Sequence, residues 1–174
     1  FLLKILCRLD YRVEGLEHLP PGAAILLSKH QSAWETIAFQ QIFPAQTWVL
    51  KRELMWIPLF GWALALTRPI AIDRGAGRRA VEEVVTQGRE RLQSGIWVVV
   101  FPEGTRVAPG TRKRYAMGGA ILAAESGYPV VPVAHNAGSF WLRRGFMKKP
   151  GTVRVVIGPT IDPRGRMPEE IIKQ

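Results

Sequence analysis

One apolar run near the middle of the chain limits the possible folds more than any other stretch. Residues 96–101 read Ile-Trp-Val-Val-Val-Phe, and β-branched and aromatic residues of this kind favour strands. A strand that is apolar along its whole length must be covered on both faces, as central strands of parallel sheets are. We therefore expect helices on both faces of a sheet built around this strand.

Other short apolar runs alternate along the chain with segments of helical pattern. Strands are expected at residues 11–15, 23–27, 48–50, 69–72, 130–134 and 153–157, and helices at residues 32–43, 80–93 and 117–126. This alternation predicts an α/β fold with a mixed, mostly parallel sheet flanked by helices. Pro132 predicts that its strand lies at a sheet edge or contains a bulge.

Polar residues follow the central apolar run directly. After Phe101 the sequence reads Pro-Glu-Gly-Thr-Arg. In open α/β sheets, ligands bind just outside the carboxyl ends of the strands. This block is therefore a candidate binding segment.

A histidine and a carboxylate lie at an earlier strand-to-helix junction. Residues 28–35 read Ser-Lys-His-Gln-Ser-Ala-Trp-Glu. Side chains five apart do not meet within one helix, so we expect His30 to precede the helix and Glu35 to come from its first turns. Such a carboxylate fixes one imidazole tautomer and leaves the other nitrogen to take a proton from a hydroxyl. Taken alone, the pair is also typical of a surface or capping feature.

The net charge of the chain limits the classes of binding partner that we expect. Its 24 basic and 14 acidic residues give a net charge of +10, which favours phosphate esters, an acidic carrier protein, a membrane surface or nucleic acid. No nucleic-acid-binding module is recognisable, so we expect no nucleic-acid partner. The single cysteine, Cys7, excludes an internal disulfide and fits a reducing compartment.

Several kinds of catalytic site are disfavoured by the motifs. The histidines at positions 18, 30 and 135 lack zinc-ligand spacing, so we expect no metal. Neither a G-x-S-x-G elbow nor a G-x-x-x-x-G-K-[ST] loop is present. What remains is the His30–Glu35 pair together with separate cations. Lys51, Arg74 and Arg106 are suited to holding a phosphate.

Two apolar segments allow more than one interpretation. Residues 1–9 could form a core helix, an interfacial helix or the end of a membrane anchor. Residues 51–62 contain two tryptophans and are broken by a proline and a glycine. They could form a buried helix, line an apolar groove or lie on a membrane. The length of 174 residues predicts a single domain. Because the chain opens with Phe1 and stops within a helical pattern, we expect an excerpt of a longer protein.

Four blocks of the sequence, in order, resemble the glycerolipid acyltransferase superfamily, and most closely the bacterial 1-acyl-glycerol-3-phosphate acyltransferases. The family motif N-H-x-S-x-x-D corresponds to residues 29–35. The motif K-x-x-L-x-x-x-P-x-x-G followed by I-D-R corresponds to residues 51–61 and 72–74. The motif F-P-E-G-T-R is matched in full by residues 101–106, and a V-P-V block by residues 131–133. The third motif alone is highly specific.

The resemblance implies a role for each matched residue. His30 would be the general base that takes the proton from the glycerol hydroxyl, and Glu35 would orient it. The other matched residues would bind substrates: Lys51 and Arg106 hold the phosphate of the acyl acceptor, Arg74 contacts the phosphate or the donor, and Glu103, Gly104 and Thr105 shape the pocket.

The resemblance also implies the reaction and its place in the cell. The reaction would be acylation of the sn-2 hydroxyl of lysophosphatidic acid, giving phosphatidic acid, with acyl-CoA or acyl carrier protein as donor and no cofactor. The family implies an enzyme at the cytoplasmic face of the inner membrane. We accordingly expect residues 1–174 to be one acyltransferase domain that lacks the N-terminal membrane helices and the C-terminal end.

Two residues depart from the family pattern. Glu35 replaces Asp and is one methylene longer, which changes the reach of the pair. Lys29 replaces Asn beside the histidine, so any support that the Asn gives to the backbone must come from elsewhere.

Two alternatives therefore stay open. One is another lysolipid acceptor, such as a lyso-ornithine lipid, for which loss of Lys51 or Arg106 should matter less. The other is a non-catalytic basic module on anionic membranes, whose lipid binding would be insensitive to His30→Ala.

Overall fold

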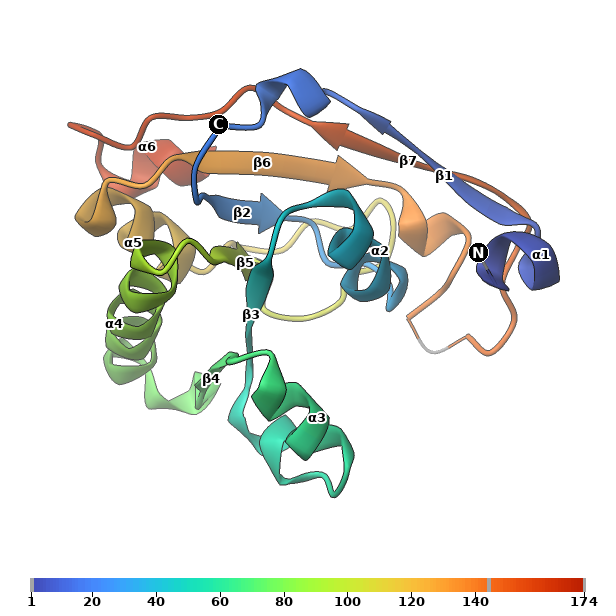
Figure 1. Ribbon diagram of the computed structural model, residues 1–174, viewed down its shortest axis with the longest axis horizontal. Coiled ribbons are helices and arrows are strands. Elements are labelled where there is room, and N and C mark those ends of the chain that lie inside the picture. Colours follow the sequence, from blue (N-terminus) through green and yellow to red (C-terminus); the bar gives the residue numbers. More distant parts are fainter. Residues whose placement is uncertain (1, 144, 174) are drawn as a thin grey trace.

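The computed structural model describes residues 2–143 and 145–173. Its centre is a seven-stranded sheet in the order β1-β7-β6-β2-β5-β3-β4 (Figure 1). Neighbouring strands are parallel except for β6 and β7, which are antiparallel. The prediction of a mixed, mostly parallel sheet is thus confirmed.

The strands lie close to their predicted positions. Their bounds are β1 (Leu9–Glu14), β2 (Ile25–Ser28), β3 (Gln46–Lys51), β4 (Ile70–Ile72), β5 (Trp97–Val100), β6 (Val130–His135) and β7 (Gly151–Ile157). Strand β5, the apolar run from which the fold was inferred, pairs with β2 on one side and β3 on the other. All four of its residues are buried, as expected of a central strand.

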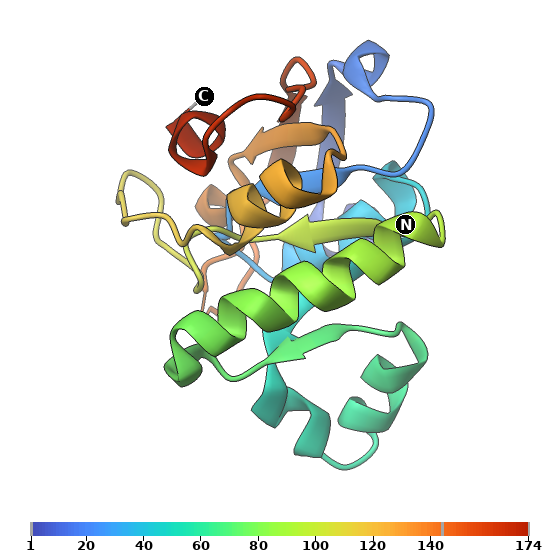
Figure 2. The same cartoon turned by 90° about the vertical axis from the view of Figure 1, so that its left-hand side faces the viewer.

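Helices cover both faces of the sheet. The α-helices are α1 (Leu2–Cys7), α2 (Trp34–Ile42), α3 (Phe60–Leu66), α4 (Arg78–Gln93), α5 (Gly118–Ser126) and α6 (Pro168–Lys173). Short 3₁₀ turns are η1 (Leu16–His18), η2 (Arg52–Trp56), η3 (Arg74–Ala76) and η4 (Ala137–Ser139). Helices α4, α5 and α6 lie on one face, seen towards the viewer in Figure 2. Helix α2 lies on the other face, where its Phe39 is fully buried.

Alternating side chains of the strands form two apolar layers. In β5, Trp97 and Val99 join the layer beneath α2, whereas Val98 and Val100 join the layer beneath α4 and α5. This alternation follows from the two-residue period of a strand. The central strand therefore separates the two layers.

Two glycines set the spacing of the helices on the α4–α5 face. A Cβ atom on Gly88 of α4 would lie 2.5 Å from a methyl carbon of Leu122 in α5. A Cβ on Gly119 would lie 2.7 Å from a methyl carbon of Leu27 in β2. The backbone of α5 therefore comes close to its neighbours at Gly119. A Cβ on Gly118 would have its nearest neighbour, in Val84, at 3.8 Å.

The prediction that Pro132 lies in an edge strand is wrong. Strand β6 is interior, with β2 on one side and β7 on the other. Its pairing with β7 begins at Val133, so Pro132 lies just outside that ladder. The Pro132 carbonyl still accepts a hydrogen bond from the N–H of Gly158. Proline has no backbone N–H, and Pro132 lies at a position where no β6–β7 ladder bond needs one.

The structure reduces the alternatives for the two apolar segments. Helix α1 has no buried residue, and Leu2, Ile5 and Leu6 are exposed, so the core-helix interpretation is wrong. Residues 51–62 form η2 and the start of α3 with most side chains outside the core, so a buried helix is wrong as well. Among the described helices, none combines the length and apolar character needed to cross a bilayer. Phe1 and Gln174 lie outside the described residues.

Candidate active site

The His–Glu pair forms at the junction of β2 and α2, as the spacing predicts. His30 lies in the loop after β2, and Glu35 is in the first turn of α2. The Nδ1 atom of His30 is 2.9 Å from Oε1 of Glu35. Because a carboxylate accepts, Nδ1 carries the proton, and Nε2 remains for a substrate.

Glu35 is a fully buried carboxylate with a complete set of donors. Besides His30, the backbone N–H groups of Gln31 and Ser32 each donate to it at 2.8 Å. Burial acts to raise the pKa of Glu35, but the hydrogen bond from His30, the electrostatic effect of the nearby His135 and the hydrogen bond from Ser32 together lower the pKa below its ordinary value. The carboxylate therefore stays charged beside the imidazole.

Two residues of the 101–106 block hold His30 in place. The ring of Phe101 stacks on the imidazole, with 3.9 Å between ring centroids and 12° between planes. The carboxylate of Glu103 accepts a hydrogen bond from the backbone N–H of His30 at 2.6 Å. Glu103 is buried. The family resemblance predicted that Glu103 shapes a substrate pocket. In the structure its carboxylate binds the backbone of the histidine.

The backbone before His30 has support that sequence reasoning missed. The Lys29 ammonium is 3.5 Å from Glu103, and the Lys29 carbonyl lies 2.9 Å from Nε2 of His135. His135 is the last residue of β6, at the same carboxyl edge of the sheet as His30. Its place two residues after the V-P-V block was the signal in the sequence. The question raised by Lys29 in place of Asn is therefore answered by side chains from two distant segments.

An apolar cavity of about 360 Å³ lies beside His30. Three of the residues that line it come from η2 and α3, namely Leu54, Phe60 and Leu64. The groove interpretation of residues 51–62 is thus confirmed. The cavity also includes Arg74 and Arg106, so two of the three predicted cations are brought to the histidine.

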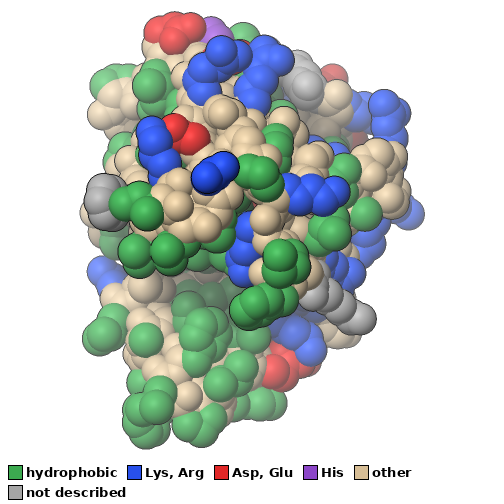
Figure 3. Space-filling model, turned by 90° about the vertical axis from the view of Figure 1, so that its right-hand side faces the viewer, with side chains coloured by type: hydrophobic (Ala, Val, Ile, Leu, Met, Phe, Trp, Pro, Cys, Tyr) green, Lys and Arg blue, Asp and Glu red, His purple; other side chains and the backbone are tan. Residues whose placement is uncertain are grey.

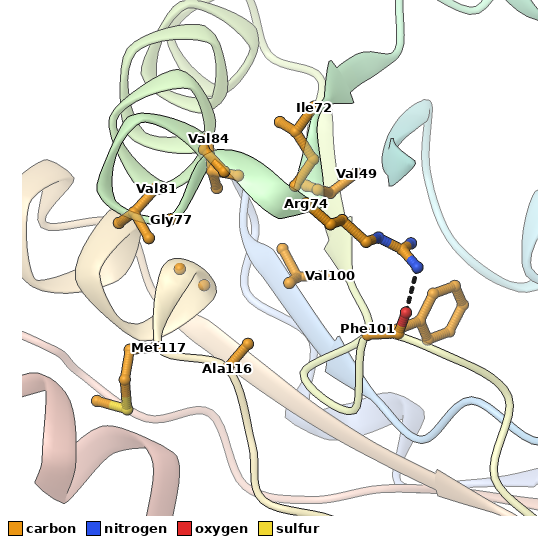
Figure 4. Close-up of a pocket in the computed structure, with 14 residues that line it drawn as sticks. Val49, Ile72, Arg74, Gly77, Val81, Val84, Val100, Phe101, Ala116 and Met117 are labelled. Carbon is orange, nitrogen blue, oxygen red and sulfur yellow. Dashed lines mark hydrogen bonds between the residues drawn. The ribbon is translucent and has the colours of Figure 1, made fainter. Parts of the chain in front are cut away.

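Arg74 also borders a second cavity on the opposite face of the sheet. This cavity, of about 240 Å³, is lined mainly by apolar side chains of α4, β5 and the start of α5 (Figure 4). The Arg74 guanidinium donates to the carbonyl of Gly104, the dashed line in Figure 4. Gly104 has a φ of +67°, which favours glycine. Arg74 thus ties β4 to the loop that follows β5.

The other residues predicted to bind substrate, Arg106, Lys51 and Thr105, differ in burial and in their hydrogen-bond partners. The buried Nε of Arg106 has no hydrogen-bond partner among the described residues, which leaves it for a ligand. Lys51 is exposed, and its ammonium pairs with Glu53 at 2.6 Å. Lys51 does not line the cavity beside His30. Thr105 is half-buried in the loop between Gly104 and Arg106. Among residues 2–143 and 145–173, no three potential metal-ligating side chains lie together.

The arrangement suits proton transfer from a hydroxyl on an amphipathic molecule. A charged, buried carboxylate fixes the tautomer of an imidazole whose second nitrogen is available to a substrate. An apolar cavity takes an alkyl chain, and guanidinium groups hold a phosphate. Together these groups form a candidate site that can take a proton from the hydroxyl of an amphipathic, phosphate-bearing molecule.

The family of the chain follows from comparison with known proteins. The model of the Acyltransferase family matches residues 10–136, which hold His30, Glu35 and the whole 101–106 block. The chain therefore belongs to this acyltransferase family, as its motifs predicted.

Named relatives agree with this family. The chain is 46% identical over 171 residues to 1-acyl-sn-glycerol-3-phosphate acyltransferase of Pseudomonas aeruginosa, covering 98% of this chain and 66% of that protein. It is 27% identical to human 1-acyl-sn-glycerol-3-phosphate acyltransferase alpha, covering 97% of this chain and 61% of the relative. The chain thus spans about two thirds or less of the length of these relatives.

A solved structure has the same fold. The crystal structure of the lysophosphatidic acid acyltransferase PlsC of Thermotoga maritima superposes with a TM-score of 0.75 at 27% identity. The match covers 94% of this chain and 69% of that chain.

Proposed function

We propose that the protein transfers a fatty acyl group from acyl-CoA or acyl carrier protein to the sn-2 hydroxyl of lysophosphatidic acid, forming phosphatidic acid. The observation that carries this proposal is the His30–Glu35 pair, 2.9 Å apart, at an apolar cavity that also contains Arg74 and Arg106. The names of the relatives support the same reaction.

His30 is the general base of the proposed reaction. Its Nε2 takes the proton of the sn-2 hydroxyl while the hydroxyl oxygen attacks the thioester carbonyl carbon. The resulting tetrahedral intermediate collapses, the carbon–sulfur bond breaks, and the thiolate takes the proton back from the imidazolium. Glu35 stabilises that imidazolium through Nδ1. No covalent acyl-enzyme is required.

The acceptor phosphate is held by arginine in this proposal. Arg106 supplies a buried Nε without a partner among the described residues, and Arg74 lines the same cavity. A guanidinium binds a phosphate through two parallel hydrogen bonds. Lys51 contributes only if its pair with Glu53 opens.

The donor's acyl chain enters the cavity beneath η2 and α3. Leu54, Phe60 and Leu64 provide an apolar wall for it close to His30. Alkyl chains gain free energy from such burial in proportion to the apolar area removed from water.

The same two elements are proposed to rest on the membrane surface at its cytoplasmic face. Their outer side chains form an apolar surface, seen in the lower part of Figure 3. The side chains of Trp56, Leu59, Trp62 and Leu66 are each at least 67% exposed. Large exposed apolar patches are typical of interaction sites. A lipid substrate could then pass from the bilayer into the adjacent cavity.

The proposal is tested by acyl transfer in membranes that contain the full-length parent protein. Lysophosphatidic acid is offered with acyl-CoA or acyl carrier protein, and wild type is compared with His30→Ala. His18→Ala is the matched control, because His18 also bonds a distant group, the Ile157 carbonyl. We expect loss of about 10²-fold or more in kcat for His30→Ala only.

Three other outcomes would contradict parts of the proposal. Activity that survives His30→Ala would exclude this histidine as the base. Transfer to a phosphate-free lysolipid, but not to lysophosphatidic acid, would replace the acceptor. Lipid binding without transfer to any acceptor, unchanged by His30→Ala, would favour a non-catalytic module.

A further inference from the structure

His135 is a buried histidine that the proposed reaction does not use. It ends β6, and its ring packs against the rings of Trp34 and Phe39 of α2, with centroids 6.2 and 6.0 Å apart. Both of its ring nitrogens are engaged. Nε2 lies 2.9 Å from the Lys29 carbonyl, and the N–H of Ala137 points to Nδ1 at 3.3 Å.

These two contacts determine the tautomer of His135. A carbonyl only accepts and a backbone N–H only donates, so Nε2 carries the proton and Nδ1 is bare. Burial lowers the pKa of His135, although the attraction of Glu35 opposes this. The ring is thus a neutral donor directed at one backbone carbonyl.

That carbonyl belongs to the residue before His30. Besides His135, the hydroxyl of Ser28 lies 3.1 Å from the Lys29 carbonyl. On the other side of the same peptide, Glu103 accepts from the His30 N–H. The peptide bond between residues 29 and 30 is therefore held at its oxygen and at its nitrogen by side chains from β6 and from the loop after β5.

From this arrangement we infer that His135 is a positioning residue for His30. By fixing the peptide that precedes the base, His135 sets the place of the imidazole relative to the substrate hydroxyl, while Glu35 sets its rotation. This inference rests on the proposed acyl transfer. It adds a residue outside the four motif blocks to the machinery of the reaction.

The test measures kcat and KM of the full-length parent protein with lysophosphatidic acid and acyl-CoA. His135→Ala is expected to lower kcat about 10- to 100-fold with KM unchanged, because a displacement of about 1 Å at the base costs that much. His135→Gln places an amide N–H where Nε2 was, and it should recover most of the loss. His18→Ala removes a comparable contact between a histidine and a distant carbonyl, that of Ile157, and should leave kcat unchanged.

The outcomes separate this inference from the proposed function. Wild-type activity that depends on His30 but is equal in His135→Ala would overturn the positioning role alone. Equal kcat in His135→Gln and His135→Ala, with both variants folded by thermal unfolding, would overturn it too. Activity that survives His30→Ala would instead overturn the general-base assignment on which the inference rests.

Discussion

Glu35 is the residue on which the local geometry of the site depends most. Its carboxylate accepts four hydrogen bonds, from the His30 ring, from the Gln31 N–H and, through both oxygens, from the Ser32 N–H. These contacts link the loop that holds His30 to the first turn of α2. With its extra methylene relative to the family's Asp, the Glu35 side chain thus reaches the imidazole and both backbone N–H groups.

At this residue scale, Glu35→Asp is expected to be harmful although Asp is the family's residue. The shorter side chain no longer reaches His30 and the backbone N–H groups from the same helix position. We expect kcat to fall about 10²-fold and the free energy of unfolding to fall by about 1–3 kcal/mol. Acyl-transfer kinetics and urea unfolding measure the two effects.

The control for this variant is Glu82→Asp. Glu82 is exposed on α4, where it pairs with Arg78, so the same methylene is removed without a buried partner. Equal kcat in Glu35→Asp and wild type would show that the loop adapts to either length.

At the scale of elements, η2 and α3 carry two opposite surfaces. One side lines the cavity beside His30, and the other is exposed. Leu64 and Leu66 lie on the same short helix, but only Leu64 lines the cavity, whereas Leu66 is 86% exposed. This difference makes the two leucines a matched pair for testing the acyl cavity.

Leu64→Trp is expected to shorten the acyl chain that the protein prefers. The larger side chain fills part of the cavity, so transfer of the longest chains should fall about tenfold or more relative to shorter ones. Competition between acyl-CoA substrates of different lengths measures this ratio. Leu66→Trp should leave the ratio unchanged, and an equal shift in both variants would place the chain elsewhere.

At the scale of the whole molecule, positive charge and exposed apolar groups act together. The chain has a net charge of +10. On the face shown in Figure 3, basic side chains lie above and beside the apolar groups. Charge attracts an anionic bilayer over about a Debye length, and apolar side chains add short-range affinity.

Binding of the 174-residue chain to vesicles tests this face. We expect sedimentation with anionic vesicles, weaker binding at 1 M salt because the Debye length falls to about 3 Å, and weaker binding by Trp62→Asp. Leu16→Asp introduces the same charge at an exposed leucine in η1 and serves as the control. Equal binding by both variants would exclude η2 and α3 as the contact.

Local features of this protein were readable from its sequence. The apolar run of β5 predicted a central strand because burial on both faces requires apolar residues at every position. The spacing of His30 and Glu35 predicted their contact because only a short stretch of backbone separates them. The block from Phe101 to Arg106 predicted the edge of the sheet at which the site forms.

Contacts between distant segments were decided only by the tertiary structure. The interior place of β6, the bond from His135 to the Lys29 carbonyl and the bond from Arg74 to Gly104 each depend on how separate strands are ordered in the sheet. Glu103 belongs to the same group, since its backbone role appears only when β5 lies beside β2. The pattern of apolar and polar side chains along an element predicts which of its faces is buried. It does not report which neighbour covers that face, because many strand orders bury the same residues equally well.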